Sequence, residues 1–489
     1  MLVDKLLAIA DRSPERTAVV DPTRELSFAN LVRFADVMRR QVVAQTRRPN
    51  VGIMLPSTVA FAGTFFGALW AGRTAIPLNF LLQPAELAKV IEDADIDVVF
   101  TIRHFQSMLS GMPVRAIFLE DLPLKREMVL ERLRFKPAAP AVNADDIAVI
   151  LYTSGTSGLP KGVCLSHGNL AHDAVACVRH ARLTGEHRFL GILPLFHTFG
   201  LTAMLLVPVE LGATVYYQPR FQLTAVVEEI RSRRISVMMA VASMYTALLR
   251  LKEPSADDWA SVEYAISGGE ALSPVTYDGF RQRFGRTLVQ GYGLTETSPV
   301  VSIDLPWSHR AGTVGRPIPG VEVTAHDDAG RPLPSGETGE LWVRGPTVMR
   351  GYYKKPTETA AVMTPDGWFK TGDMGTVDAD GYVSITGRKK ELIIVGGENV
   401  YPREIENVLD EHPAVVESAV IGAGDGSRGE QIVAFVLLRD GASATDIELR
   451  EFCRGRLANY KVPRRVIIRP DLPRGPTGKL MKRRLSEFL

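Results

Sequence analysis

Short β-branched runs alternate with longer helical patterns over most of this chain, and that alternation limits the folds available to it. The run NVGIML is followed by the helical pattern STVAFAGTFFGALWAG, and then by TAIPLN, QPAELAKVIEDAD and IDVVFT. The runs GATVYY, ISVMMAV, VEYAISG and TLVQGYG continue the rhythm. Strands that alternate with helices indicate parallel-rich sheets covered by helices, which is the α/β class. A chain of 489 residues is also too long for one core, so at least two domains are expected.

The pattern changes twice toward the C-terminus. Between about 312 and 386, short strands alternate with Gly, Pro and Asp turns and no helical pattern is apparent, which predicts a β-rich subdomain. From residue 389 onward, strands and two amphipathic helices predict a compact α+β unit of about 100 residues. We therefore expect a large N-terminal domain, 1–388, and a small C-terminal domain, 389–489, joined by a short charged connection that suits a hinge.

Composition excludes several classes of protein. The 57 Lys and Arg residues nearly balance the 55 Asp and Glu residues, so the net charge of +2 gives no general attraction to nucleic acid. The three cysteines, Cys164, Cys177 and Cys453, form neither a disulfide framework nor a CxxC metal pattern, which favours a reducing, cytoplasmic location. The N-terminus has the pattern of an amphipathic helix and not of a signal peptide.

The most apolar stretch, 189–217, does not have the pattern of a membrane span. Pro194, His197, Pro208 and Glu210 interrupt it, whereas a spanning helix needs roughly 20 apolar residues in a row. A buried strand–helix–strand unit is expected there instead. Peripheral contact with a membrane stays open, and so does the oligomeric state.

The stretch YTSGTSGLPKGV, residues 152–163, combines glycines, hydroxyls and one lysine behind an apolar run. Glycines let a backbone approach an anion closely, and consecutive N–H groups can bind a phosphate. The stretch is not the G-x4-G-K-[ST] phosphate loop, because Pro160 stands at the second glycine position and Gly162 follows Lys161. A solvated surface turn is the alternative to another kind of phosphate loop.

This stretch resembles the phosphate loop of the acyl-adenylate-forming (AMP-binding) enzymes, which include acyl-CoA synthetases, luciferases and peptide-synthetase adenylation domains. Six further segments resemble the family's motifs in the family's order: SGGEAL (267–272), GYGLTETSPV (291–300), GELWVRGPTVMRGYY (339–353), GWFKTGD (367–373), GRKKELIIVGGENVYPREIE (387–406) and PTGKLMKRRL (476–485). The resemblance covers nearly the whole chain and points to the fatty acid–CoA ligase branch. It implies ATP-dependent activation of a carboxylic acid to an acyl-adenylate with release of pyrophosphate. Transfer to the thiol of coenzyme A would then give acyl-CoA and AMP.

The resemblance also implies which residues serve the phosphates and the metal. In adenylation a carboxylate attacks the α-phosphate of ATP, so negative charge must be neutralised there. Thr295 would contact the α-phosphate, and Glu296 and Thr156 would hold the Mg²⁺ that enters with ATP. Lys479 would be the catalytic lysine, because its charge offsets the repulsion between the carboxylate and the phosphate. The residues that would grip the β- and γ-phosphates are Thr153, Ser154, Gly155, Thr156, Ser157, Gly158 and Lys161.

A second set of residues would select the nucleotide. By resemblance, Tyr292 stacks on adenine, Asp373 accepts both ribose hydroxyls, and Arg388 reaches the ribose or the α-phosphate. Gly293 follows Tyr292 in the same motif, and the other side of the base would be lined by Gly268, Gly269 and Glu270. The plainer alternatives are an exposed loop carboxylate for Glu296, a turn aspartate for Asp373 and an interdomain salt bridge for Arg388.

Thioester formation requires a rebuilt site, because Lys479 has little to offer when a thiol attacks the acyl carbonyl. The resemblance implies that the small domain is mobile and rotates about Lys390. This rotation would bring Gly396, Gly397 and Glu398 to the active site for the coenzyme A step. The neighbouring residues Lys482, Arg483 and Arg484 are expected on a solvated helix face.

The acid itself is the least constrained part of the prediction. His197 would face the acyl substrate by resemblance, although a lone histidine in an apolar stretch is more often a core residue, and Gly291 would leave room for an aliphatic chain. The pocket segments LFHTFGLTAML, VASMYTALL and VQGYGLTE hold no arginine that could pair a second carboxylate. A medium- or long-chain fatty acid is therefore expected, with an aryl acid as the rival. Coenzyme A is the expected acceptor, and an acyl carrier protein is the alternative.

Overall fold

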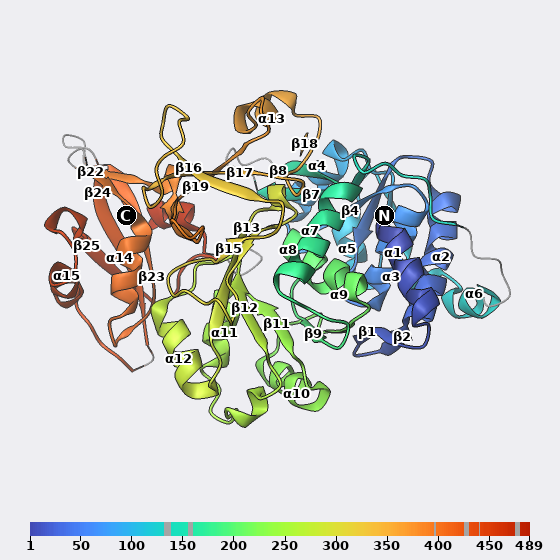
Figure 1. Ribbon diagram of the computed structural model, residues 1–489, viewed down its shortest axis with the longest axis horizontal. Coiled ribbons are helices and arrows are strands. Elements are labelled where there is room, and N and C mark those ends of the chain that lie inside the picture. The colour runs from blue at the N-terminus through green and yellow to red at the C-terminus, as the bar shows by residue number, and fades with distance from the viewer. Residues whose placement is uncertain (132–137, 155–159, 396–397, 425–429, 440, 475–479) are drawn as a thin grey trace.

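The computed structural model describes residues 1–131, 138–154, 160–395, 398–424, 430–439, 441–474 and 480–489. Figure 1 shows helix-covered sheets built by the segments coloured blue to yellow, and a smaller orange and red unit at the other end of the molecule. The predicted fold class is confirmed: parallel-rich sheets, a β-rich subdomain and a small α+β C-terminal domain are all present.

One sheet of the large domain carries the two strands on either side of the glycine-rich stretch. Its seven strands lie in the order β18-β8-β7-β4-β3-β5-β6, and the strands from β7 to β6 run parallel, whereas β8 and β18 are antiparallel. The bounds are β3 (Asn50–Met54), β4 (Thr74–Pro77), β5 (Val98–Thr101), β6 (Arg115–Phe118), β7 (Ile147–Ser154), β8 (Pro160–Ser166) and β18 (Gly351–Tyr352). Helix α3 (Val59–Trp70), which connects β3 to β4, is apolar on every side and almost wholly buried, because it lies between the sheet and α2 (Phe28–Gln45).

The second sheet has nine strands in the order β15-β14-β13-β12-β11-β9-β10-β1-β2. The strands from β13 to β1 run parallel and the outer strands are antiparallel. The bounds are β1 (Thr17–Asp21), β2 (Arg24–Ser27), β9 (Arg188–Gly191), β10 (Thr214–Tyr217), β11 (Val237–Ala240), β12 (Tyr264–Gly268), β13 (Leu288–Gly293), β14 (Val300–Ile303) and β15 (Arg316–Pro317). Functional residues are expected where β12 and β13 end, because ligands of α/β sheets bind at the carboxyl ends of strands.

The remaining helices of the large domain cover these sheets or connect their strands. They are α1 (Leu2–Arg12), α4 (Pro84–Asp93), α5 (Gln106–Leu109), α6 (Leu124–Leu130), α7 (His167–His180), α8 (Thr198–Leu201), α9 (Val207–Leu211), α10 (Leu223–Arg233), α11 (Ala242–Leu248) and α12 (Pro274–Phe284). The apolar stretch 189–217 forms the predicted strand–helix–strand unit, with β9 and β10 flanking α8, a π-helical turn at 202–206 and α9. Among the residues that the structure describes, no helix combines the length and the apolar character that crossing a membrane requires.

The β-rich subdomain centres on an antiparallel sheet of β16 (Glu322–His326), β17 (Gly339–Arg344), β19 (Phe369–Val377) and β20 (Val383–Arg388). The expectation that this segment lacks helices is wrong, since it contains α13 (Pro356–Val362). Pro356 starts this helix, but its seven residues are too few to show a periodic apolar face and none is buried. The subdomain also contributes one strand to each of the two large sheets, β15 to the nine-stranded sheet and β18 to the seven-stranded sheet. Strand pairing therefore connects it to both sheets of the large domain.

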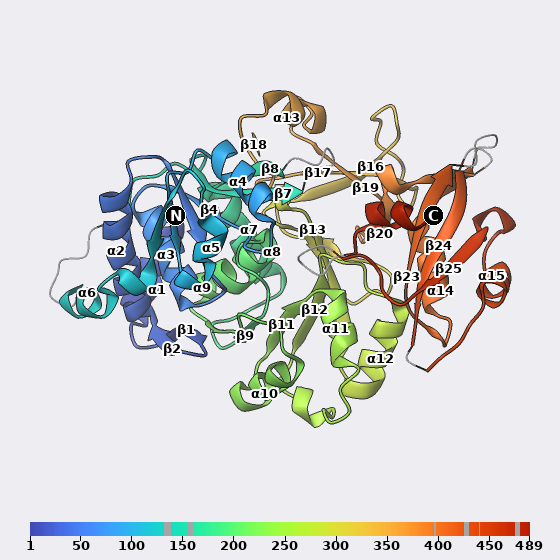
Figure 2. The ribbon, with the colours of Figure 1, turned by 180° about the vertical axis from the view of Figure 1, so that it is seen from behind.

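The C-terminal domain packs two helices on a three-stranded sheet. Its strands are β23 (Val415–Gly424), β24 (Glu430–Leu438) and β25 (Arg465–Arg469), beside the hairpin of β21 (Ile393–Val395) and β22 (Glu398–Val400). The helices are α14 (Pro402–Asp410) and α15 (Asp446–Arg454), and Ile405 and Leu409 of α14 are buried as its apolar spacing predicts. Seen from behind in Figure 2, this unit lies beside β19 and β20.

Candidate active site

The strands on either side of the glycine-rich stretch, β7 and β8, pair antiparallel. Thr153 at the end of β7 pairs with Lys161 near the start of β8. A pair of antiparallel strands differs from the strand–loop–helix of the common phosphate loop. This agrees with the argument from Pro160 that the stretch is not that loop. Four of the predicted phosphate ligands, Gly155, Thr156, Ser157 and Gly158, lie outside the described residues, and Ser154 ends β7.

A charged cluster stands beside these two strands. The ammonium nitrogen of Lys161 lies 5.0 Å from the centre of the Tyr352 ring, within the range of a cation–π interaction. The Tyr352 hydroxyl donates a hydrogen bond of 2.9 Å to Oε1 of Glu296, which lies in the short helix Thr295–Thr297. The structure therefore brings two predicted residues, Lys161 and Glu296, onto one tyrosine. Sequence reasoning missed Tyr352, although it stands inside the quoted motif GELWVRGPTVMRGYY.

A second cluster joins the end of β13 to the β-rich subdomain. The Tyr292 hydroxyl donates to Oδ2 of Asp373 over 2.7 Å, and Nε of Arg388 lies 2.5 Å from Oδ1 of the same carboxylate. Asp373 and Arg388 face each other in register on β19 and β20. Asp373 is therefore a strand residue and not a turn aspartate, and Arg388 pairs within one sheet and not across the two domains.

Burial sets the protonation of this second cluster. Burial raises the pKa of Tyr292 well above its ordinary value, and the neighbouring Asp373 carboxylate raises it further. The phenol therefore stays protonated and acts as the donor, while the charge of Asp373 is balanced by the Arg388 guanidinium. The cluster presents one fixed, buried carboxylate at the end of the nine-stranded sheet.

Two glycines and an aromatic ring form the apolar wall next to this carboxylate. Gly268 on β12 lies opposite Gly291 on β13. A Cβ atom at Gly268 would stand 3.2 Å from the Phe199 ring, so that ring packs directly on the glycine backbone. A Cβ atom at Gly291 would meet its nearest neighbours at 3.7 and 3.8 Å, which is ordinary van der Waals contact, so a methyl group fits there. Phe199 is a second residue that sequence reasoning did not single out.

Other predicted residues lie around this wall. His197 begins α8, with its ring centre 4.7 Å from that of Phe196. Gly269 has a φ of +77°, a conformation that favours glycine. The Glu270 carboxylate accepts a hydrogen bond of 3.1 Å from the Ser243 backbone N–H at the start of α11, so it also holds a neighbouring turn.

The functional residues predicted on the C-terminal domain are only partly described. Glu398 is exposed on β22, whereas Gly396, Gly397 and the predicted catalytic residue Lys479 lie outside the described residues. Lys390 lies in the helical turn that follows β20, where burial lowers the pKa of its ammonium and the charge of Arg388 lowers it further.

The expectation of a solvated face for Lys482 is wrong. Its ammonium nitrogen lies 2.6 Å from Oε1 of the buried Glu406 and 3.4 Å from Oε2 of Glu391. The charge of Lys482 thus balances a carboxylate inside the C-terminal domain. Arg484 is exposed and pairs with Glu487, as a solvated position would.

The possible metal-binding side chains of the site suit a magnesium ion that arrives with a nucleotide. Within the described ranges, no group of three or more His, Cys, Asp or Glu side chains is placed to hold a metal ion. Mg²⁺ keeps several waters and binds through one or two carboxylates together with substrate phosphates. The single carboxylate of Glu296 beside Lys161 fits that mode of binding.

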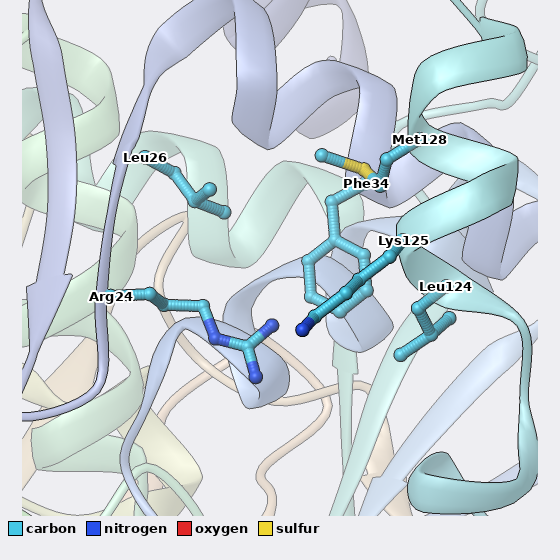
Figure 3. A pocket seen from close by; sticks show the side chains of 6 residues that line it. All are labelled: Arg24, Leu26, Phe34, Leu124, Lys125 and Met128. Carbon is cyan, nitrogen blue, oxygen red and sulfur yellow. The ribbon is translucent and has the colours of Figure 1, made fainter.

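A separate pocket of about 270 Å³ lies elsewhere on the large domain, among β2, α2 and α6. Figure 3 shows the Lys125 ammonium and the Arg24 guanidinium beside the Phe34 ring. The lining residues are Arg24, Leu26, Phe34, Leu124, Lys125 and Met128, and none of them belongs to the predicted site.

Sequence comparison adds independent findings. The family profile of the AMP-binding enzymes matches residues 7–353, and the profile of the AMP-binding enzyme C-terminal domain matches residues 404–479. The long-chain-fatty-acid–CoA ligase of Bacillus subtilis (strain 168) is 33% identical, covering 98% of this chain and 92% of that protein. The sulfoacetate–CoA ligase of Cupriavidus necator is 34% identical, with coverages of 98% and 96%. The feruloyl-CoA synthase of an Amycolatopsis species is 35% identical, with coverages of 97% and 96%.

Solved structures agree with these matches. The ATP-bound MatB of Rhodopseudomonas palustris has a TM-score of 0.92 at 31% identity, covering 100% of this chain and 99% of that chain. The o-succinylbenzoate coenzyme A synthetase (MenE) of Bacillus subtilis, in complex with ATP and magnesium ion, has a TM-score of 0.87 at 30% identity, and 99% of each chain is covered. This chain belongs to the AMP-binding enzyme family, among its AMP-forming acid–CoA ligases.

Proposed function

We propose that this enzyme converts a medium- or long-chain fatty acid to its coenzyme A thioester in the cytoplasm, through an acyl-adenylate. The observation that carries the proposal is that two clusters of side chains are built on consecutive elements, with Tyr292 on β13 and Glu296 on the short helix that follows. Lys161 and Glu296 form a cationic and metal-binding end, while Tyr292 and Asp373 form a carboxylate end that suits a ribose. Because β13 leads directly into the helix that holds Glu296, one nucleotide can reach both clusters.

In the first step, a carboxylate oxygen of the acid forms a bond to the α-phosphorus of ATP. The bond from that phosphorus to the oxygen bridging the α- and β-phosphates breaks, and pyrophosphate leaves with the electron pair. Lys161 stabilises the leaving charge, and Lys479 reduces the repulsion between the two anionic reactants. Mg²⁺, held by Glu296 and Thr156, would supply further positive charge on the triphosphate.

The Asp373 carboxylate orients the nucleotide. Tyr292 and Arg388 hold it in place, and each oxygen of a carboxylate can accept more than one hydrogen bond. Asp373 can therefore accept from the ribose hydroxyls without leaving its partners. Since the group is fixed before binding, little ordering is needed when ATP arrives.

The choice of a fatty acid rests on the apolar wall. Phe199 covers Gly268, and a Cβ atom at Gly291 would meet its neighbours only at ordinary van der Waals distances, without a clash. The neighbouring segments 195–205, 241–249 and 289–296 contain no lysine or arginine, so nothing in them pairs a charge on the far end of the acid. Each buried methylene contributes about 0.8 kcal/mol, so an apolar wall favours long chains without selecting one length sharply.

In the second step, the thiol sulfur attacks the acyl carbonyl, AMP leaves, and the thiol proton is released. We assign this step to a second orientation of the C-terminal domain, with the hinge at Lys390 and with Gly396, Gly397 and Glu398 beside the thiol. Coenzyme A is the proposed acceptor. An acyl carrier protein is the alternative, because it presents the same phosphopantetheine arm.

The similarity to feruloyl-CoA synthase favours an aryl acid as the second candidate substrate. A panel of acids from acetate to palmitate, with benzoate and ferulate, separates the two. We expect acid-dependent ATP–pyrophosphate exchange and thioester formation to be greatest with medium- or long-chain acids, with AMP as the nucleotide product. A maximum with benzoate or ferulate would replace the fatty acid by an aryl acid. Formation of ADP and orthophosphate would contradict the reaction itself.

A further inference from the structure

Tyr352 reaches the phosphate end of the site through strand pairing. The short strand β18 pairs antiparallel with β8, so that Tyr352 lies opposite Val163. Lys161 lies on the same strand β8, two residues before Val163. This register places the tyrosine ring under the Lys161 ammonium, and the hydroxyl at the edge of that ring reaches Glu296. One side chain thus contacts both charged residues of the cluster.

The backbone around this tyrosine is tied to the backbone around Glu296. The Met349 N–H donates to the Glu296 carbonyl oxygen over 2.8 Å. The Ser298 hydroxyl donates to the Thr347 carbonyl oxygen over 2.7 Å, and Ser298 is fully buried. These two hydrogen bonds hold the segment before Tyr352 against the segment that carries Glu296.

Helix α7 fixes the segment before Tyr352 to the end of β8. The side-chain oxygen of Asn169 accepts from the Ser166 N–H over 2.9 Å. Its side-chain nitrogen donates to the carbonyl oxygens of Pro346 and Val348 over 2.7 and 2.9 Å. Both hydrogens of the amide are thus used on the segment that leads into β18, and Asn169 is buried. The position of Tyr352 is consequently set by a rigid support and not by a loop alone.

The hydrogen bond between Tyr352 and Glu296 has one direction. The phenol carries the hydrogen and an ionised carboxylate can only accept, so Tyr352 donates and Glu296 accepts. A hydrogen bond from a fixed donor to a carboxylate restricts the rotation of that carboxylate.

We propose that Tyr352 is a positioning residue for adenylation, which orients the Glu296 carboxylate toward the magnesium–ATP complex through its hydroxyl and holds the Lys161 ammonium through its ring. The inference rests on the proposed function, in which Glu296 and Lys161 serve the triphosphate. Tyr352 acts through these two residues and takes no part in bond making. Its influence is therefore confined to the half-reaction that uses magnesium and ATP.

Two substitutions separate the hydroxyl from the ring. Tyr352→Phe keeps the ring under Lys161 and removes only the donor to Glu296. We expect the magnesium concentration for half-maximal ATP–pyrophosphate exchange to rise about tenfold, which corresponds to the loss of about 1.4 kcal/mol. Tyr352→Leu removes the ring as well, so the KM for ATP should rise in addition. Thioester formation from supplied acyl-adenylate and coenzyme A should stay at the wild-type rate in both variants.

The adjacent tyrosine offers a matched control. Tyr353 lies next to Tyr352 on the chain, but its hydroxyl accepts from the Asn50 side chain over 3.1 Å, away from the cluster. Tyr353→Phe should leave the magnesium dependence unchanged. An unchanged magnesium dependence in Tyr352→Phe, or an equal loss in both half-reactions, would overturn the role of Tyr352. Absence of acid-dependent exchange in the wild-type enzyme would instead overturn the proposed function, and this inference with it.

Discussion

At the scale of single residues, the site depends on side chains that are held before any substrate arrives. Asp373 receives a hydrogen bond from the half-buried Tyr292 phenol and forms an ion pair with a guanidinium on the adjacent strand. Glu296 receives a hydrogen bond from Tyr352. A carboxylate that is already oriented loses little freedom on binding, so more of the interaction energy is available to bind and orient the nucleotide.

The glycines of the motif GYG differ in the space around them, which leads to a prediction. A Cβ atom at Gly293 would stand 1.9 Å from the Pro299 carbonyl oxygen, whereas one at Gly291 meets nothing closer than 3.7 Å. Gly293→Ala must displace the backbone that carries Glu296, so ATP–pyrophosphate exchange should fall by about 100-fold. Gly291→Ala should fold and adenylate normally but shift the preferred acid toward shorter chains, as the acid panel would report. Equal losses in the two variants would contradict this assignment.

At the scale of elements, α14 carries a buried acid that makes the stability of the C-terminal domain depend on pH. Asp410 ends α14 and accepts from the Ser418 hydroxyl on β23 over 2.7 Å. The pKa of Asp410 is raised to about 7, chiefly by burial and in part by the charges of Glu406 and Glu417, although the Ser418 hydrogen bond and the Arg403 charge lower it. The folded domain therefore keeps this proton up to about pH 7, whereas the unfolded chain releases it near pH 4.

The sign of the pH dependence follows from this difference. Between about pH 4 and pH 7 the folded state binds more protons, so raising the pH destabilises the domain, by on the order of 4 kcal/mol over the whole range. Asp410→Asn removes the titrating group, so the variant should melt several degrees above the wild type at pH 8 and near it at pH 5. Thermal unfolding at the two pH values tests this. Asp471→Asn, at an exposed carboxylate of the same domain, is the control and should not change the pH dependence.

The elements also show which parts of the fold local sequence patterns can predict. The apolar face of α14 and the strands of the two large sheets follow from periodicity, because their burial repeats along the chain. Helix α13 was missed, since seven exposed residues carry no such repeat. The ion pair of Lys482 was missed for a different reason: its buried partner Glu406 lies far away in the sequence, on α14.

At the scale of the whole molecule, two domains meet near the proposed site. The Arg403 guanidinium of α14 donates to the Leu272 carbonyl oxygen over 3.0 Å, within the motif SGGEAL of the large domain. Lys389, which follows β20, lies 3.2 Å from Oε2 of Glu340 and 2.9 Å from Oδ1 of Asp328. These polar contacts are individually weak, which is consistent with the proposed second orientation of the C-terminal domain.

A pair of substitutions tests whether each orientation serves one half-reaction. Lys479→Ala should abolish acid-dependent ATP–pyrophosphate exchange and leave thioester formation from supplied acyl-adenylate intact, because the thiol attack does not need that charge. Gly397→Leu should do the reverse, because a bulky side chain would block the approach of the thiol. Single-turnover assays of each half-reaction measure both effects. If each variant loses both half-reactions to the same degree, the two-orientation mechanism is wrong for this enzyme.

By itself, the sequence determined the α/β class and the enzyme family, and it predicted the division of the chain and most residues of the proposed site, because these depend on local periodicity and on short motifs. The tertiary structure alone decided which of those residues touch. Tyr352 lies between Lys161 and Glu296 only because β18 pairs with β8 in one register. Phe199 packs on Gly268 only because α8 crosses the end of β12. The register of β18 against β8 and the position of α8 at β12 depend on how all the elements of the domain bury their apolar faces together. No short segment of the chain contains that information.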